Sequence, residues 1–165
     1  MAMTDLSSDP ANMSLAIEQA RLAEQAGEVP IGAVIVDASG AVVASGQNRM
    51  IRDHDPTAHA EIVALRAAGA IQSNYRLEGC ALYATLEPCA MCAGAMIHAR
   101  LARLIFGAAD PKAGAAGSVL QVLNHPRLNH RMEVVAGIAE AECGELLREF
   151  FRARRAAERL SSLSF

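Results

Sequence analysis

The sequence predicts a three-layer α/β/α sandwich built on a mixed five-stranded sheet. A hairpin pattern near the start is followed by strands that alternate with helices. The composition is aliphatic, with 52% hydrophobic residues but only 4% aromatic ones. Alternation implies parallel strands joined by crossover helices, whereas a hairpin is antiparallel, so the sheet is expected to be mixed. We expect residues 1–165 to form one domain, because 165 residues is an ordinary domain size.

Four segments are expected to form helices because their apolar residues recur with helical spacing, and a shorter fifth helix is expected between two loops. They are residues 13–27, 57–69, 88–100 and 141–160, with the shorter one at 119–124. The first is expected to end at Gly27, and the second to begin with Thr57 as N-cap and end at Gly69. Pro88 suits the first turn of the third helix, because its missing N–H costs nothing there.

Five β-branched or aliphatic runs bounded by turn residues are expected to form strands. They are residues 30–37, 41–47, 80–86, 101–108 and 131–137. The first two flank the short turn Ala-Ser-Gly and therefore predict the hairpin. Residues 48–56 are expected to be a polar loop and residues 109–118 a glycine-rich loop. The polar start, residues 1–12, is expected to be flexible.

Composition and charge limit the class of protein. No apolar run is long enough to span a bilayer, and the start does not resemble a signal peptide, so we expect a cytoplasmic protein without a membrane partner. Four cysteines in such a protein are typical of metal ligands or buried thiols rather than disulfides. A net charge of −3 gives no overall field that attracts nucleic acid, although local basic patches remain open.

Two short motifs, "HAE" at 59–61 and "PCAMC" at 88–92, place residues that commonly bind metals at the expected helix starts. Cys89 and Cys92 are three residues apart on one helical face and can bind one ion together. At a helix N-terminus, the His59 side chain can converge on the same ion, and the positive helix end favours thiolates. One imidazole and two thiolates suit tetrahedral Zn²⁺ and leave one position for water, as in catalytic sites.

Glu61 is the candidate for proton transfer. It is too close to His59 in sequence to be a comfortable fourth ligand, but it can hydrogen-bond a water activated by zinc and pass on the proton. Two alternatives remain open for the ligand set. His54 is the strongest rival ligand, and Cys80 could complete a closed structural site, although its place in a strand favours a buried thiol.

These residues resemble the signature of zinc-dependent nucleoside and nucleobase deaminases, H-x-E with P-C-x-x-C. Longer stretches, including "NYRL" and "LYATLEPCAMCAGAMIHAR", are similar to the bacterial tRNA adenosine deaminase family over roughly residues 13–155. The resemblance implies a cytidine-deaminase-like fold, a homodimer and one Zn²⁺ per subunit. It implies deamination of adenosine to inosine at the wobble position of a tRNA anticodon, usually ACG of an arginine tRNA, by zinc-activated water.

The resemblance also implies substrate contacts in the anticodon stem-loop. Glu61 would protonate N1 of adenine and then the leaving ammonia. Asn48 matches a family asparagine that hydrogen-bonds the flipped base, and the main chain at Ala60 and near Pro88 supplies further contacts. The chain departs from the family pattern at positions near these contacts: Gln47, where tryptophan is frequent, Met50, Ala109 and Pro111.

Contacts to the RNA backbone are expected from two segments. Asp110 and Lys112, in the glycine-rich loop, are candidates for ribose and phosphate contact. The final helix carries a basic stripe formed by Arg148, Arg152, Arg155 and Arg159. The alternative is a solvated face, because Glu145, Glu149 and Glu158 are close enough to pair with these arginines. Phe150 and Phe151 are expected to pack this helix onto the domain.

Two other functions remain open. A deaminase of free nucleobases or nucleosides would use the same zinc chemistry on a metabolite, without RNA contacts. A zinc-stabilised binding module would keep the ligands but would not need Glu61.

Overall fold

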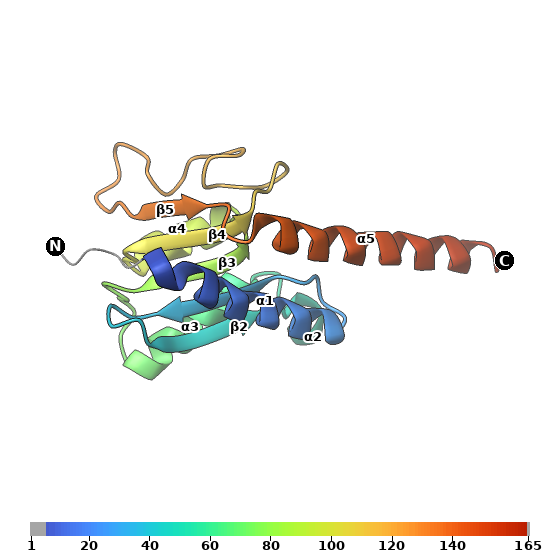
Figure 1. Ribbon diagram of the computed structural model, residues 1–165, viewed down its shortest axis with the longest axis horizontal. Helices are drawn as coiled ribbons and strands as arrows, with labels where there is room; N and C mark the ends of the chain where they lie inside the picture. Colours follow the sequence, from blue (N-terminus) through green and yellow to red (C-terminus); the bar gives the residue numbers. More distant parts are fainter. Residues whose placement is uncertain (1–5, 165) are drawn as a thin grey trace.

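The computed structural model describes residues 6–164 and has three layers, with a five-stranded sheet between helices (Figure 1). The strands lie in the order β2-β1-β3-β4-β5. Their bounds are Gly32–Val36 (β1), Val42–Gln47 (β2), Ala81–Leu86 (β3), Arg103–Ala108 (β4) and Glu133–Ala136 (β5). β1 is antiparallel to both β2 and β3, whereas the pairs β3–β4 and β4–β5 are parallel. The predicted mixed α/β/α sandwich is therefore confirmed.

The helices cover both faces of the sheet. They are the 3₁₀ turn η1 (Leu6–Ser8), α1 (Asp9–Gln25), α2 (Met50–Asp53), α3 (Ala60–Gln72), α4 (Ala90–His98) and α5 (Glu140–Ser162). α1 and the beginning of α5 pack on one face, and α3 and α4 pack on the other. The C-terminal half of α5 extends away from the sheet (Figure 1). No helix in residues 6–164 is both long and apolar enough to cross a membrane.

Side-chain alternation along the central strands builds the two cores. In β1, Ala33 and Ile35 pack on the side of α3 and α4, whereas Val34 and Val36 pack on the side of α1. β3 and β4 alternate in the same way, because successive side chains of a strand point to opposite faces. The predicted hairpin turn is also present. The Asp37 carboxylate accepts hydrogen bonds from the N–H groups of Ser39 and Ala41.

The N-terminal segment corrects the expectation that residues 1–12 are flexible. α1 begins at Asp9, whose side chain is only 2% exposed. The Asp9 carboxylate accepts a 2.7 Å hydrogen bond from the Tyr83 hydroxyl and forms a 3.1 Å ion pair with Arg103. Burial of this charge is tolerated because it has both an opposite charge and a hydrogen-bond donor. The polar character of the segment thus reflects a buried network of polar side chains. Residues 1–5 lie outside the described part of the chain.

The predicted start and end of the second helix are wrong. The Asp55 carboxylate holds Thr57 in a turn, accepting its N–H at 2.8 Å, so α3 starts only after His59. The helix continues through Gly69 and ends where Ser73 adopts a left-handed conformation, with φ of 49°. A glycine inside a helix is tolerated when the surrounding packing compensates for its entropy.

Three further expectations differ from the structure. Pro88 precedes α4 rather than opening it, because Cys89 is the N-cap. The expected loop at 48–56 contains the short helix α2. The expected helix at 119–124 is absent. Gln121 instead forms an isolated β-bridge with Ala116, so this segment is part of an irregular loop.

Close packing of α3 on β2 depends on Gly46. A Cβ at this position would collide with the Ala60 carbonyl oxygen and lie 2.6 Å from the Ala64 nitrogen. We expect Gly46→Ala to destabilise the fold by about 1–3 kcal/mol, because overpacking shifts backbone that cannot easily move. Urea denaturation measures this change. Gly94→Ala is the control, since a Cβ there meets nothing within 4 Å and helix propensity should increase stability by about 0.5–1 kcal/mol. Equal midpoints for the two variants would contradict the packing argument.

Candidate metal centre and its surroundings

The two motifs meet where α3 and α4 begin. His59 is the N-cap of α3 and Cys89 is the N-cap of α4, both with extended backbone conformations. The His59 Nδ1 atom lies 3.6 Å from Cys89 Sγ and 3.5 Å from Cys92 Sγ. The three ligand atoms all lie within 4.8 Å of one another. One ion with bonds of about 2.0–2.3 Å can contact all three atoms.

The rival ligands are not part of this group. Cys80 is buried and lies 3.9 Å from the Gln72 amide nitrogen, and Cys143 is buried at the beginning of α5. His54 is exposed in a left-handed conformation at the end of α2. The group of potential ligands found within residues 6–164 consists of His59, Cys89 and Cys92.

The two sulfurs carry unequal charge. A hydrogen bond from Cys92 and a second one involving His59 lower the pKa of Cys89 to about 3. The same Cys89 contact raises the pKa of Cys92, so one proton is held between the pair. The contact with Cys89 also raises the pKa of His59. The surroundings of Cys89 therefore favour its thiolate form, which is the form that binds metals.

Glu61 lies beside this group in the first turn of α3, with only 4% of its surface exposed. Burial raises the pKa of Glu61 to about 7, although its own backbone N–H and the nearby His59 favour the ionised form. A carboxyl group with a pKa near neutrality can both accept and release a proton under ordinary conditions.

Asn48 is held against the same helix start. Its side-chain Oδ1 accepts a 2.9 Å hydrogen bond from the Ala60 N–H, so the structure brings these two predicted residues together. The Ala60 N–H is therefore paired with Asn48, and a contact between the Ala60 main chain and the base stays a prediction. The segment after Asn48 is anchored by Glu28, which is 1% exposed and accepts the N–H groups of Ile51 and Arg52. Sequence reasoning missed Glu28, because a single acidic residue before a strand gives no sign of burial.

A groove of about 780 Å³ separates the loop at 109–118 from α5. It brings together four predicted RNA-contact residues, and these are Asp110, Lys112, Arg152 and Arg155. Arg148 also lines the groove but pairs with Glu145 at 2.8 Å. Arg159 is not among its lining residues. The Asp110 carboxylate accepts N–H groups within its own loop, from Lys112 and Ala113.

Phe151 corrects the packing expected for the final helix. It is 38% exposed and lines this groove, so it does not pack the helix onto the domain. The buried residues of α5 are Cys143 and Leu146, because only the beginning of the helix contacts the sheet. The aromatic ring consequently lies beside the arginines of the groove.

A three-layer sandwich with a His, Cys and Cys group at two helix starts is typical of the deaminases. A family profile described as MafB19-like deaminase matches residues 7–155. The tRNA-specific adenosine deaminase of Haemophilus influenzae is 46% identical over 152 residues, covering 92% of this chain and 88% of the relative. The Bacillus subtilis enzyme of the same name is 44% identical over 150 residues, covering 91% and 92%. The chain belongs to this family of tRNA-specific adenosine deaminases.

Solved structures agree with this relationship. One, from studies of A-to-I editing by tRNA:A34 deaminases at the wobble position, has a TM-score of 0.80 and 46% identity, covering 83% of this chain and 99% of the other. A guanine deaminase from Nitrosomonas europaea has a TM-score of 0.76 and 26% identity, covering 86% and 83%. The fold is therefore shared with an enzyme whose name refers to a free nucleobase, guanine.

The ligand geometry predicts that loss of one sulfur weakens metal binding. We expect Cys89→Ser to bind Zn²⁺ at least about a hundredfold more weakly, since even changes behind the ligands cost about 10–100-fold. Metal analysis after dialysis against a chelator measures the zinc content. Cys80→Ser removes a thiol outside the group and should keep the wild-type content. Equal zinc retention by both variants would show that Cys89 is not a ligand.

Proposed function

We propose that the chain is a cytoplasmic, zinc-dependent hydrolase that converts adenosine to inosine at the wobble position of a tRNA anticodon, ACG of an arginine tRNA. One observation carries the proposal. The ligand atoms of His59, Cys89 and Cys92 lie within 4.8 Å of one another, beside the buried Glu61. Relatives with 46% and 44% identity are named tRNA-specific adenosine deaminase, which supports this substrate.

The donor set fits zinc. His59 would supply one nitrogen, and Cys89 and Cys92 would supply two sulfurs, a combination that hard cations such as Mg²⁺ do not favour. Bound there, Zn²⁺ would supply the Lewis acidity that makes a water nucleophilic toward C6 of adenine near neutral pH.

Glu61 moves the protons. Its carboxylate accepts a proton from the attacking water and delivers it to N1 of the adenine. It then takes the remaining proton from the hydroxyl added at C6 and transfers it to the amino group. The C6–N bond breaks as the C6 carbonyl forms, so adenosine and water become inosine and ammonia. The pKa of about 7 that burial gives Glu61 suits both directions of transfer.

Asn48 orients the base. Because its Oδ1 accepts the Ala60 N–H, the amide NH₂ is available as a donor toward a ring nitrogen of adenine. The main chain near Pro88 supplies further contacts. A base can reach these groups only when it is splayed out of the anticodon loop, as single-stranded RNA bases commonly are.

The basic groove binds the RNA backbone next to that base. Lys112, Arg152 and Arg155 face one groove, and Arg152 keeps 68% of its side chain exposed despite Glu145 at 3.9 Å. Phosphates are attracted to such a cluster whatever the total charge of the chain. Phe151 in the same groove offers a surface on which a flanking base can stack.

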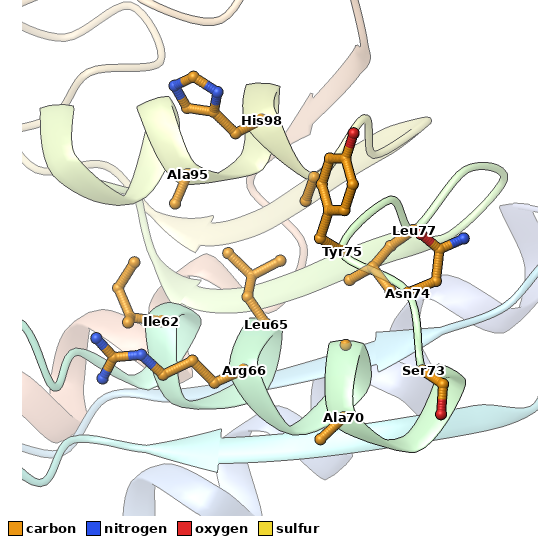
Figure 2. Close-up of a pocket in the computed structure, with 12 residues that line it drawn as sticks. Ile62, Leu65, Arg66, Ala70, Ser73, Asn74, Tyr75, Leu77, Ala95 and His98 are labelled. Carbon is orange, nitrogen blue, oxygen red and sulfur yellow. The ribbon is translucent and has the colours of Figure 1, made fainter.

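We further propose that the chain forms a homodimer through α3 and α4. A groove of about 910 Å³ lies between these helices. Figure 2 shows apolar side chains that line it, such as Ile62, Leu65 and Leu77. Tyr75, at its rim, is 74% exposed, and Ile71 nearby in sequence is 66% exposed. A second copy would cover these groups and bring a second set of arginines to the RNA, which an acidic single chain needs.

The function is tested with an anticodon stem-loop carrying ACG. We expect the wild-type chain to produce inosine in this RNA and not to deaminate free adenosine, cytidine or guanine. Glu61→Gln should lower the rate by about 10²–10⁴-fold, because proton transfer is lost. Mass spectrometry of digested RNA measures inosine.

The control is the zinc content of Glu61→Gln, which should equal that of the wild type. Turnover of free guanine instead of the stem-loop would favour a free-base deaminase, the function named for the Nitrosomonas europaea neighbour. Full activity of Glu61→Gln would exclude the proposed proton transfer.

The groove predicts a difference between neighbouring arginines. Arg152→Ala and Arg155→Ala should each weaken stem-loop binding. The slope of log K for binding against log salt concentration should also become shallower, by about 0.7 for each phosphate that is no longer neutralised. Arg154→Ala is the matched control, because Arg154 lies outside the groove and pairs with Glu158 at 3.5 Å. Fluorescence anisotropy at several salt concentrations provides the slopes, and identical slopes for all three variants would rule out this groove.

A further inference from the structure

Glu87, the last residue before Pro88, has a buried side chain that the proposed chemistry does not use. It is 2% exposed and directed into the loop at 109–118. One carboxylate oxygen accepts the N–H groups of Ala116 and Ser118, each at 3.0 Å. The other accepts the Asp110 N–H at 2.9 Å and the Ser118 hydroxyl. All four donors belong to one irregular loop. The carboxylate therefore accepts backbone N–H groups that a helix or strand would otherwise pair within itself.

The carboxylate is bound as an anion. Burial raises the pKa of Glu87, but the hydrogen bonds from Ser118, Asp110 and Ala116 outweigh it, and the pKa is lowered overall. Hydrogen bonds to a charged acceptor are stronger than those between neutral groups. The loop is therefore held more firmly than its glycine content suggests.

The loop also closes tightly around this side chain. A Cβ at Gly114 would collide with the Glu87 carboxylate. The Ala115 N–H donates a 2.8 Å hydrogen bond to the Pro88 carbonyl oxygen, one residue before Cys89. The near end of the same loop, with Asp110 and Lys112, lines the basic groove. Glu87 thus connects the start of α4, which holds the sulfur ligands, to the wall of the groove.

We propose that Glu87 is a positioning residue whose carboxylate holds the loop at 109–118 in the shape that presents Lys112 to the phosphodiester backbone next to the reacting base. This inference rests on the proposed function, and it identifies the phosphodiester backbone as the part of the substrate that the loop contacts. The Glu87 side chain is not needed to hold β3 in place. β3 is already held by its pairing with β4 and by the hydrogen bond from the Glu87 N–H to the Ala108 carbonyl oxygen.

The test compares Glu87→Gln with the wild type in the zinc-loaded chain. The amide keeps the size of the side chain, but its NH₂ group faces N–H and O–H donors and its charge is lost. We expect faster hydrogen exchange at Asp110, Ala116 and Ser118. The KM for the stem-loop should rise about tenfold, while zinc content is unchanged and kcat stays within about threefold. Glu78→Gln is the matched control, because the Glu78 side chain is 68% exposed.

A second variant guards against misfolding. Ser118→Ala removes one donor and keeps the charge, so the same changes should appear at smaller size, about threefold in KM. Unchanged exchange in Glu87→Gln would show that the carboxylate does not hold the loop. Faster exchange with an unchanged KM would show that Glu87 is merely structural, and a loss of zinc would place its effect at the metal centre. Each of these results overturns the proposal.

Failure of the proposed function gives a different result. A wild-type chain that does not deaminate the stem-loop would remove the substrate role of Glu87 together with the function. Hydrogen exchange would still decide whether the carboxylate holds the loop.

Discussion

The meeting of two helix starts at one edge of the sheet is the constraint on which the rest of the site depends. β2 and β3 are both antiparallel to β1, so they run in the same direction and end at the same edge. α3 follows β2, after the short helix α2, and α4 follows β3 directly. His59 and Cys89 are therefore both N-caps, and their side chains reach one point. The positive ends of both helices stabilise thiolate there.

Buried carboxylates hold the segments around this point. Glu28 accepts N–H groups from α2, which follows Asn48, and Glu87 accepts N–H groups from the loop that follows β4. A loop without regular structure must pair its buried backbone groups in another way, and an anionic acceptor pairs several at once. The segments around the candidate metal centre are thereby held by hydrogen bonds although they are irregular.

Deaminases with different substrates share this scaffold. The Nitrosomonas europaea guanine deaminase has a TM-score of 0.76 at only 26% identity, so the sandwich alone does not define the substrate. The groove for which we propose RNA binding lies outside the central sheet, between the loop at 109–118 and α5. This is consistent with the general division between a rigid scaffold and the loops that carry specificity.

The sequence by itself determined the order of the five strands and the four long helices, the mixed sheet, and His59, Cys89 and Cys92 as candidate ligands, because these depend on local spacing. Hydrophobic alternation identifies a strand such as β1, and the spacing of Cys89 and Cys92 puts both on one helical face. Only the tertiary structure decided that Asp9 is buried, and that Glu28 and Glu87 accept N–H groups from other segments. In each case the partner is distant in sequence: Asp9 pairs with Arg103, and Glu87 with Ser118. A charged residue is read as exposed until the fold supplies its partner, because the cost of burial depends on groups that local sequence does not contain.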